Sequence, residues 1–215
     1  MQIEDLLARY DGFVFDLDGT LVDSMPLHLA GWKHASTLYG FEYDPDWFYN
    51  LGGVPSRKIA KLVAETQNIQ LDLDAVTKIK ADYYQRVIAQ SVVFPAMKEL
   101  VVQLFRQRPL AIGTGSTRTS ANIVLANNEL HPYFQIITTA DDVVHHKPHP
   151  DTFLLSAAKL NVKPSQCLVF EDTNIGLQAA HEAQMDCVLI REGKPDWNTY
   201  TLFDANKFHS SNKYD

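Results

Sequence analysis

Two pairs of acidic residues each follow a short apolar run of the sequence. Asp16 and Asp18 follow the first run, and Glu171 and Asp172 follow the fourth. Several carboxylates in one crevice repel one another unless a cation lies among them, and oxygen ligands of this kind suit Mg²⁺. Acidic residues after strands can also be helix caps. Because two strand ends carry such pairs, a shared metal site is the better interpretation.

Polar groups of other kinds follow the runs in between. Thr114 lies in a Gly-Thr-Gly-Ser turn after the second run, and Lys147 comes after the third. A hydroxyl, exposed backbone amides and a cation can together hold the oxygens of a phosphoryl group. The two glycines of the turn are not a dinucleotide fingerprint, because the third glycine is missing. A lysine alone is usually a solvated surface residue. A functional role for Lys147 is inferred because the other polar groups are expected at the same edge of the sheet.

The apolar runs that position these groups have the character of strands. They lie at residues 12–15, 110–112, 136–138, 167–170 and 187–190. From residue 110 onward they alternate with helical stretches, which predicts an α/β fold: a Rossmann-like, doubly wound parallel sheet covered on both faces. The expected helices span 120–129, 151–160 and 176–184. Because parallel strands end at one edge of a sheet, the acidic residues, Thr114 and Lys147 should meet there.

A long insertion, residues 24–91, separates the first strand from the second and has helical periodicity. A crossover needs only about a dozen residues, so this helical insertion is expected to form an all-helical domain on a core made of residues 1–23 and 92–215. Two sets of residues at helical spacing are predicted to mark helix faces in this insertion. The first is Leu27, Ala30, Gly31, His34 and Leu38, and the second is Val76, Ile79, Tyr83 and Val87. The polar tail after Arg191 is expected to pack on the surface or to be partly disordered.

Composition excludes several classes of protein. The net charge is -7 and no run of Lys and Arg occurs, which argues against nucleic-acid binding. Cys167 and Cys187, the only cysteines, stand in or beside apolar runs and are expected to be buried, inert thiols of a reducing compartment. The N-terminus has no signal-like apolar segment, and no run approaches the roughly 18 apolar residues that span a membrane. A cytoplasmic protein is therefore expected, and nothing demands more than a monomer.

Four motifs resemble those of the haloacid dehalogenase superfamily, in the order that family has them. They are Phe15-Asp16-Leu17-Asp18-Gly19-Thr20-Leu21, Thr114 after an apolar run, Lys147-Pro148-His149-Pro150-Asp151, and Glu171-Asp172-Thr173-Asn174-Ile175-Gly176. The helical insertion resembles the cap of the β-phosphoglucomutase-like subgroup. Within this subgroup, the chain is most similar to fructose-1-phosphate / 6-phosphogluconate phosphatases.

The resemblance implies a Mg²⁺-dependent phosphatase that acts on a small sugar phosphate, such as fructose 1-phosphate or 6-phosphogluconate, through an aspartyl-phosphate. Asp16 would be the nucleophile, and Asp18 would protonate the leaving alcohol and then deprotonate the attacking water. Thr114 and Lys147 would hold the phosphoryl oxygens, with Ser116 and the backbone N–H groups of Leu17 and Gly115. The metal would be bound by Asp16, the backbone carbonyl of Asp18, Asp172 and, directly or indirectly, Glu171.

Substrate contacts from the helical insertion are predicted for His28, Gly53 and Arg57, while Trp32 is better explained by packing. A β-phosphoglucomutase is the alternative function. Mutases tend to carry a lysine where this chain has Gly52, which weakens that alternative, although Arg57 can take the role of the lysine. A non-catalytic binding module that keeps the fold is a third possibility. The intact set of Asp16, Asp18, Lys147 and Asp172 argues against it.

Overall fold

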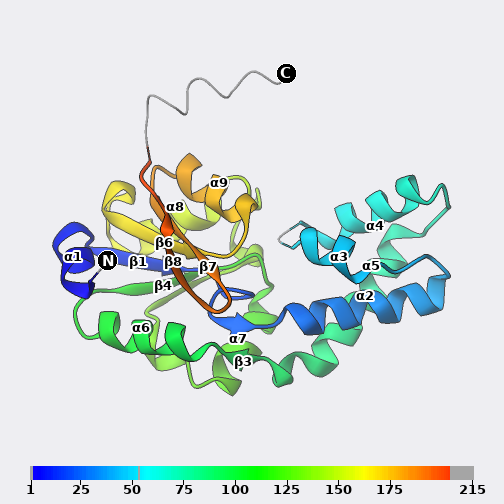
Figure 1. Ribbon diagram of the computed structural model, residues 1–215, viewed down its shortest axis with the longest axis horizontal. Coiled ribbons are helices and arrows are strands. Elements are labelled where there is room, and N and C mark those ends of the chain that lie inside the picture. Colours follow the sequence, from blue (N-terminus) through cyan, green and yellow to red (C-terminus); the bar gives the residue numbers. More distant parts are fainter. Residues whose placement is uncertain (1, 53, 204–215) are drawn as a thin grey trace.

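A computed structural model of the protein describes residues 2–52 and 54–203, and places a six-stranded sheet at the centre of the larger lobe (Figure 1). The strand order is β5-β4-β1-β6-β7-β8, and the first four pairings are parallel. These strands are β1 (Gly12–Phe15), β4 (Leu110–Gly113), β5 (Ile136–Thr138), β6 (Cys167–Glu171), β7 (Asp186–Arg191) and β8 (Lys194–Thr201). The predicted α/β fold with a mainly parallel sheet is confirmed.

Helices cover both faces of this sheet. One face packs against α1 (Ile3–Arg9), α6 (Pro95–Phe105) and α7 (Arg118–Asn127), and the other against α8 (Asp151–Leu160) and α9 (Asn174–Glu182). Short 3₁₀ helices occupy Ile88–Gln90, His131–Tyr133, Ala140–Asp142 and Pro164–Gln166. None of the helices in the described part of the chain is long and apolar enough to cross a membrane.

The strands are apolar on both sides because both sides are buried. Successive side chains of a strand point to opposite faces, so Phe13 and Phe15 of β1 pack toward α6 and α7, while Val14 packs toward α8. Cys167 and Cys187 are free, buried thiols in the apolar cluster between the sheet and the helices α8 and α9. Burial raises the pKa of Cys167 to about 12. The expectation of buried thiols is therefore confirmed.

The helical insertion contains α2 (Met25–Tyr39), α3 (Pro45–Asn50), α4 (Ser56–Thr66) and α5 (Leu73–Val87), which pack around their own apolar cluster (Figure 1). Proline in the first turn begins α2 and α3, where a missing N–H costs nothing, and Gly40 ends α2 with a φ of +73°. The face predicted for α2 was wrong in part. Leu38 is 58% exposed, and the buried side of α2 is formed by Gly31, Trp32, Ala35 and Ser36.

The two connections between the insertion and the larger lobe run side by side. They form the short antiparallel strands β2 (Val22–Asp23) and β3 (Val92–Val93). Asn128, the residue that follows α7, fixes the second connection, since its Oδ1 accepts from the backbone N–H of Val93 at 2.7 Å and its Nδ2 donates to the carbonyl of Ser91 at 3.2 Å. The division into a core of residues 1–23 and 92–215 and a separate domain of residues 24–91 remains a prediction.

The chain beyond Arg191 differs from the expected polar tail. Residues Lys194–Thr201 form β8, which pairs antiparallel with β7 at the edge of the sheet. The turn between them contains Gly193 with a φ of +72°, and this glycine lies against the ring of Phe94, just after β3. Trp197 and Tyr200 are half-buried against the core, which explains how so polar a segment can be a strand. Residues 204–215 lie outside the described part.

Candidate active site

The predicted site residues lie at the carboxyl ends of adjacent strands. Asp16 directly follows β1, and its backbone N–H donates to the carbonyl of Phe170 on β6 at 2.9 Å. Glu171 is the last residue of β6. Thr114 follows β4, with its N–H donating to the carbonyl of Thr138 at 3.0 Å. The parallel register thus brings residues far apart in the sequence to one edge of the sheet, as expected.

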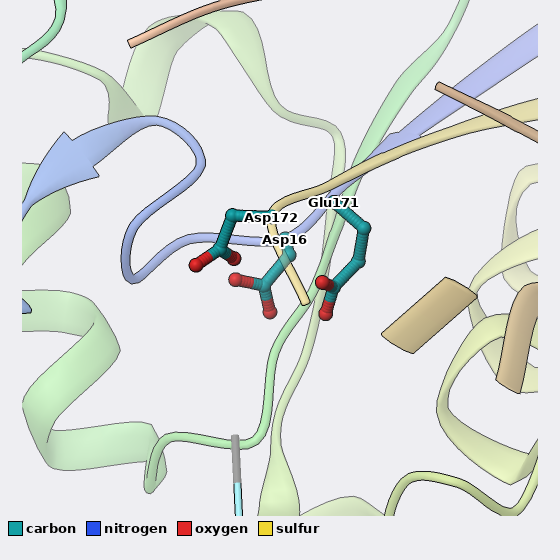
Figure 2. A group of neighbouring side chains, drawn as sticks. All are labelled: Asp16, Glu171 and Asp172. Atoms are coloured by element: carbon teal, nitrogen blue, oxygen red, sulfur yellow. The ribbon is translucent and has the colours of Figure 1, made fainter. Parts of the chain in front are cut away.

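Three carboxylates meet at this edge (Figure 2). Asp16, Glu171 and Asp172 each offer an oxygen, and these oxygens all lie within 4.8 Å of one another. Burial, followed by the charge of Glu171, raises the pKa of Asp172 to about 7, and burial raises the pKa of Asp16 well above its ordinary value. Burial and the neighbouring carboxylates thus disfavour the charged forms of Asp16 and Asp172, and a divalent cation would offset this cost. The donor set therefore fits a hard cation such as Mg²⁺.

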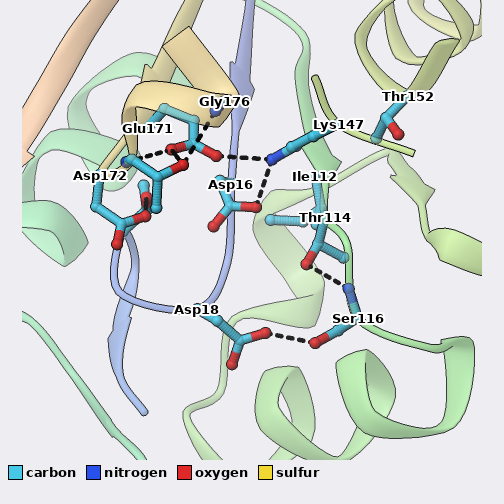
Figure 3. A network of polar contacts seen from close by, with 12 residues as sticks. Asp16, Asp18, Ile112, Thr114, Ser116, Lys147, Thr152, Glu171, Asp172 and Gly176 are labelled. Atoms are coloured by element: carbon cyan, nitrogen blue, oxygen red, sulfur yellow. Dashed lines mark hydrogen bonds and ion pairs between the residues drawn. The ribbon is translucent and has the colours of Figure 1, made fainter. Parts of the chain in front are cut away.

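Lys147 lies between two of these carboxylates (Figure 3). Its Nζ donates to Oδ1 of Asp16 at 2.7 Å and to Oε1 of Glu171 at 2.9 Å, and lies 4.5 Å from the ring centroid of Phe153. Burial would lower the pKa of this ammonium group, but the charges of Asp16 and Glu171 outweigh burial and raise it. Lys147 is therefore a fixed positive charge and not the surface lysine that its residue type alone would suggest.

Two glycines allow the acidic residues to approach. A Cβ at Gly19, where φ is +80°, would lie 2.3 Å from Oδ2 of Asp172, and a Cβ at Gly176 would lie 1.9 Å from the carboxyl carbon of Glu171. The second oxygen of Glu171 accepts from the N–H of Thr173 at 2.6 Å and from its hydroxyl at 2.8 Å. Thr173 also caps α9, so helix capping and the acidic site share this loop.

Asp18 is separate from this carboxylate group and faces the helical insertion. Oδ2 of Asp18 accepts from the hydroxyl of Ser116, and Oδ1 accepts from the Tyr84 hydroxyl at 2.9 Å and lies 3.7 Å from Nε2 of His28. Burial alone would raise the pKa of Asp18, but the contacts with His28 and Ser116 lower it below its ordinary value. Asp18 is thus held as a carboxylate in this arrangement.

A polar chain runs from Asp18 into the insertion. The His28 ring stacks on Tyr84 with 4.0 Å between ring centroids, and its Nδ1 lies 2.8 Å from Nζ of Lys80. Burial lowers the pKa of Lys80 from 10.5 to about 8. Burial and the charge of Lys80 lower the pKa of His28.

Lys80 and Tyr84 were missing from the residues predicted for the site. The buried residues of α5 are Val76, Lys80 and Tyr84, at a spacing of four residues. Of the predicted face, Val76 is buried and Ile79 packs partly buried against the apolar cluster of the insertion, so that prediction was wrong in part. A lysine placed between two apolar residues at helical spacing was the signal that could have revealed it.

A cavity of about 350 Å³ lies between the sheet edge and the helical insertion. Of the predicted residues, it is lined by Asp16, Asp18, His28, Thr114, Gly115, Ser116, Lys147, Glu171 and Asp172. Trp32 also lines it, although this side chain is buried and packs against Phe48 with 5.1 Å between ring centroids.

The described lining of the cavity includes neither Leu17 nor Arg57. The Leu17 side chain is buried in the core, which leaves only its backbone for the predicted phosphate contact. Arg57 is absent from the described lining of the cavity, and its Nε donates to Oδ1 of Asp74 at 2.8 Å on the exposed surface. This placement gives no support to a substrate contact by Arg57. Gly53 lies outside the described residues.

Comparison with known proteins identifies the family. The sequence profile of the haloacid dehalogenase-like hydrolases matches residues 13–190. The chain belongs to this family. A fructose-1-phosphate phosphatase of Escherichia coli K12 is 40% identical over 186 residues, which cover 86% of this chain and 99% of that protein. A β-phosphoglucomutase of Bacillus subtilis is 28% identical over 85% of this chain and 84% of its own.

Solved structures of the family agree with the fold. The β-phosphoglucomutase of Clostridium difficile superposes with a TM-score of 0.75 over 94% of this chain and 96% of its own, at 22% identity. The resemblance to haloacid dehalogenase-like hydrolases and the prediction of an enzyme are therefore confirmed. Because phosphatases and mutases both occur among these relatives, membership of the family leaves the fate of the phosphoryl group open.

Proposed function

We propose that the protein is a Mg²⁺-dependent phosphatase that hydrolyses a small sugar phosphate, such as fructose 1-phosphate, through an aspartyl-phosphate on Asp16. The observation that carries the proposal is the buried contact between Asp16 and Lys147, which opens onto a cavity that Asp18 also lines. A nucleophile, a fixed cation and a proton-transfer group thus surround one space. The 40% identity to a fructose-1-phosphate phosphatase supports the same substrate class.

In the first step, a carboxylate oxygen of Asp16 attacks the phosphorus atom of the ester. The bond from phosphorus to the sugar oxygen breaks, and its electron pair stays on that oxygen, which takes a proton from Asp18. Asp18 must therefore be protonated at this point, whereas it is a carboxylate in the structure. A phosphate dianion beside Asp18 favours its protonation, because a nearby negative charge raises the pKa of a carboxyl group.

In the second step, Asp18, now a carboxylate, takes a proton from water as the water oxygen attacks phosphorus. The bond between phosphorus and Asp16 breaks, inorganic phosphate leaves, and Asp18 is protonated again for the next turnover. Lys147 and the Thr114 hydroxyl hold phosphoryl oxygens in both steps. The Thr114 oxygen accepts from the N–H of Ser116 at 3.1 Å, which orients the hydroxyl and leaves its hydrogen for a phosphoryl oxygen.

Asp16, Asp172, Glu171 and the backbone carbonyl of Asp18 are the groups proposed to hold Mg²⁺. When bound, this cation would neutralise the carboxylates and the charge that develops on the phosphoryl oxygens. We also propose that residues 24–91 act as a cap domain, which closes the cavity over the substrate and is hinged at the connections that β2 and β3 form.

The alternative β-phosphoglucomutase reaction requires a cationic side chain that binds a second phosphate group of the substrate. The cation suggested for that role, Arg57, instead pairs with Asp74 on the exposed surface. This favours transfer of the phosphoryl group to water over transfer to another sugar.

Phosphate release from a panel of sugar monophosphates with Mg²⁺ tests the proposal, with Asp16→Asn and metal-free enzyme as controls. We expect turnover that vanishes in both controls. Formation of glucose 6-phosphate from β-glucose 1-phosphate, with a bisphosphate primer and without phosphate release, would instead establish the mutase. Unchanged turnover in Asp16→Asn would reject Asp16 as the nucleophile.

A further inference from the structure

The side of the cavity that the helical insertion contributes is largely apolar. We call this surface the cap wall. Its apolar side chains include Met25, Leu29, Trp32, Phe48, Val54 and Ile59. Because the phosphoryl group must lie at the sheet edge, beside Asp16 and Lys147, the cap wall faces the part of the substrate that carries no reacting phosphate.

The cap wall carries little net charge of its own. Among the described residues of the insertion that line the cavity, Lys80 is the sole lysine or arginine. Its Nζ lies 2.8 Å from Nδ1 of His28, and its charge faces that of Asp18, which His28 approaches from the other side at 3.7 Å. The rings of Tyr84 and Trp32 lie 5.2 and 6.0 Å from the same Nζ. Lys80 is thus already engaged by His28, and the charge of Asp18 offsets only part of the cost of burying its amine.

From the proposed phosphatase function and this wall, we infer that the enzyme selects sugar monophosphates whose remaining part is uncharged, and that it rejects sugar bisphosphates and sugar-acid phosphates. A second phosphate or a carboxylate would lose its water against the cap wall without gaining a partner, and burial of an unpaired charge is costly. Hydroxyl groups are rejected far less by an apolar surface. The cap wall therefore favours fructose 1-phosphate over 6-phosphogluconate.

Matched pairs of substrates test this inference. Glucitol 6-phosphate and 6-phosphogluconate differ only in an alcohol or a carboxylate at the far end, and fructose 1-phosphate and fructose 1,6-bisphosphate differ only in a second phosphate. We expect kcat/KM to be at least about 100-fold lower for the charged member of each pair. Equal or higher kcat/KM for the charged members would overturn the inference while leaving the phosphatase proposal intact.

A cation moved by one residue provides a sharper test. Ser56 lines the cavity and Arg57 does not, so the double variant Ser56→Arg/Arg57→Ser transfers the guanidinium to the cap wall at constant net charge. We expect it to raise the charged-to-neutral ratio of kcat/KM at least about tenfold. Arg57→Ser alone is the matched control and should leave the ratio unchanged.

The outcomes separate the two proposals. A control variant that changes the ratio as much as the double variant would show that Arg57 already reaches the substrate, and would overturn the inference. Lack of phosphate release from all four compounds would reject the proposed function, and the inference would fall with it. Circular dichroism and thermal unfolding establish that both variants are folded before rates are compared.

Discussion

The carboxyl group of Glu171 occupies the space in which any residue other than glycine at position 176 would place its Cβ atom, since that atom would lie 1.9 Å from the Glu171 carboxyl carbon. The same carboxylate holds Nζ of Lys147 at 2.9 Å. A glycine on α9 thereby determines where the fixed cation of the site lies.

We expect Gly176→Ala to displace Glu171 and with it Lys147, lowering kcat by about 100-fold, since small misplacements of catalytic groups are that costly. The double variant Gly176→Ala/Glu171→Asp has a shorter acidic side chain and should recover part of this loss. Steady-state kinetics of both variants checks the prediction. An alanine variant with unchanged kcat would show that Glu171 does not position Lys147.

Asp18→Asn should separate the two chemical steps. With p-nitrophenyl phosphate the leaving group needs no proton, so the first step should proceed and release p-nitrophenol once per active site. Without a base for the attacking water, turnover should then fall by at least about 100-fold. Rapid mixing detects the burst, and Asp16→Asn should give none. Equal steady-state loss without a burst would contradict the assignment of Asp18 to the second step.

Magnesium binding should weaken below neutral pH. The pKa of Asp172 is raised to about 7 by burial and by Glu171, and a carboxylate must lose its proton to bind a metal. Protons therefore compete with Mg²⁺ below about pH 7, and the apparent affinity should fall as pH falls. Titration calorimetry at pH 6 and pH 8 measures this directly. Asp172→Asn should weaken binding at both pH values and reduce the difference between them, and the part that remains would come from Asp16, whose pKa is also raised.

Lys80→Met should stabilise the protein at pH 7. Since burial lowers the pKa of Lys80 from 10.5 to about 8, the charged amine destabilises the folded state by about 3 kcal/mol at pH 7. Between pH 8 and pH 10.5 the unfolded chain binds a proton that the folded chain does not, so this penalty disappears as pH rises.

Urea unfolding of Lys80→Met and wild type at pH 7, 8 and 9 tests this linkage. The advantage of the variant should shrink above pH 8. Lys78→Met is the control, because Lys78 is exposed and pairs with Asp82 on the surface of the same helix. A stability difference that does not vary with pH would contradict the shifted pKa of Lys80.

The parallel strands and the sheet-edge residues could be predicted from the sequence because each strand end carries its own local pattern. The strands at 12–15 and 136–138 have the predicted bounds, and the residues after them line the cavity as expected. An apolar run buried on both faces needs no knowledge of its partners to be recognised, and parallel pairing fixes which ends coincide.

Features that depend on packing between distant segments could not be predicted. The polar residues of β8 form a strand because β7 offers an unpaired edge. On α2, Leu38 fits the helical period but faces solvent, since the neighbouring helices cover Trp32 and Ala35 instead. The spacing of Lys80 between Val76 and Tyr84 indicates the buried face of α5, but it does not reveal that His28 on another helix is its polar partner.

The pairing of β2 with β3 means that the chain leaves and re-enters the larger lobe at a single point. When the ends of a segment are already held together, the entropic cost of lengthening it is small, about 0.6 kcal/mol for each doubling. Insertions of other lengths and sequences can therefore be exchanged at this junction without disturbing the strand that presents Asp16. The three carboxylates at the sheet edge can then be kept while the insertion changes, and Asp18 is the group whose contacts with His28 and Tyr84 such an exchange would alter.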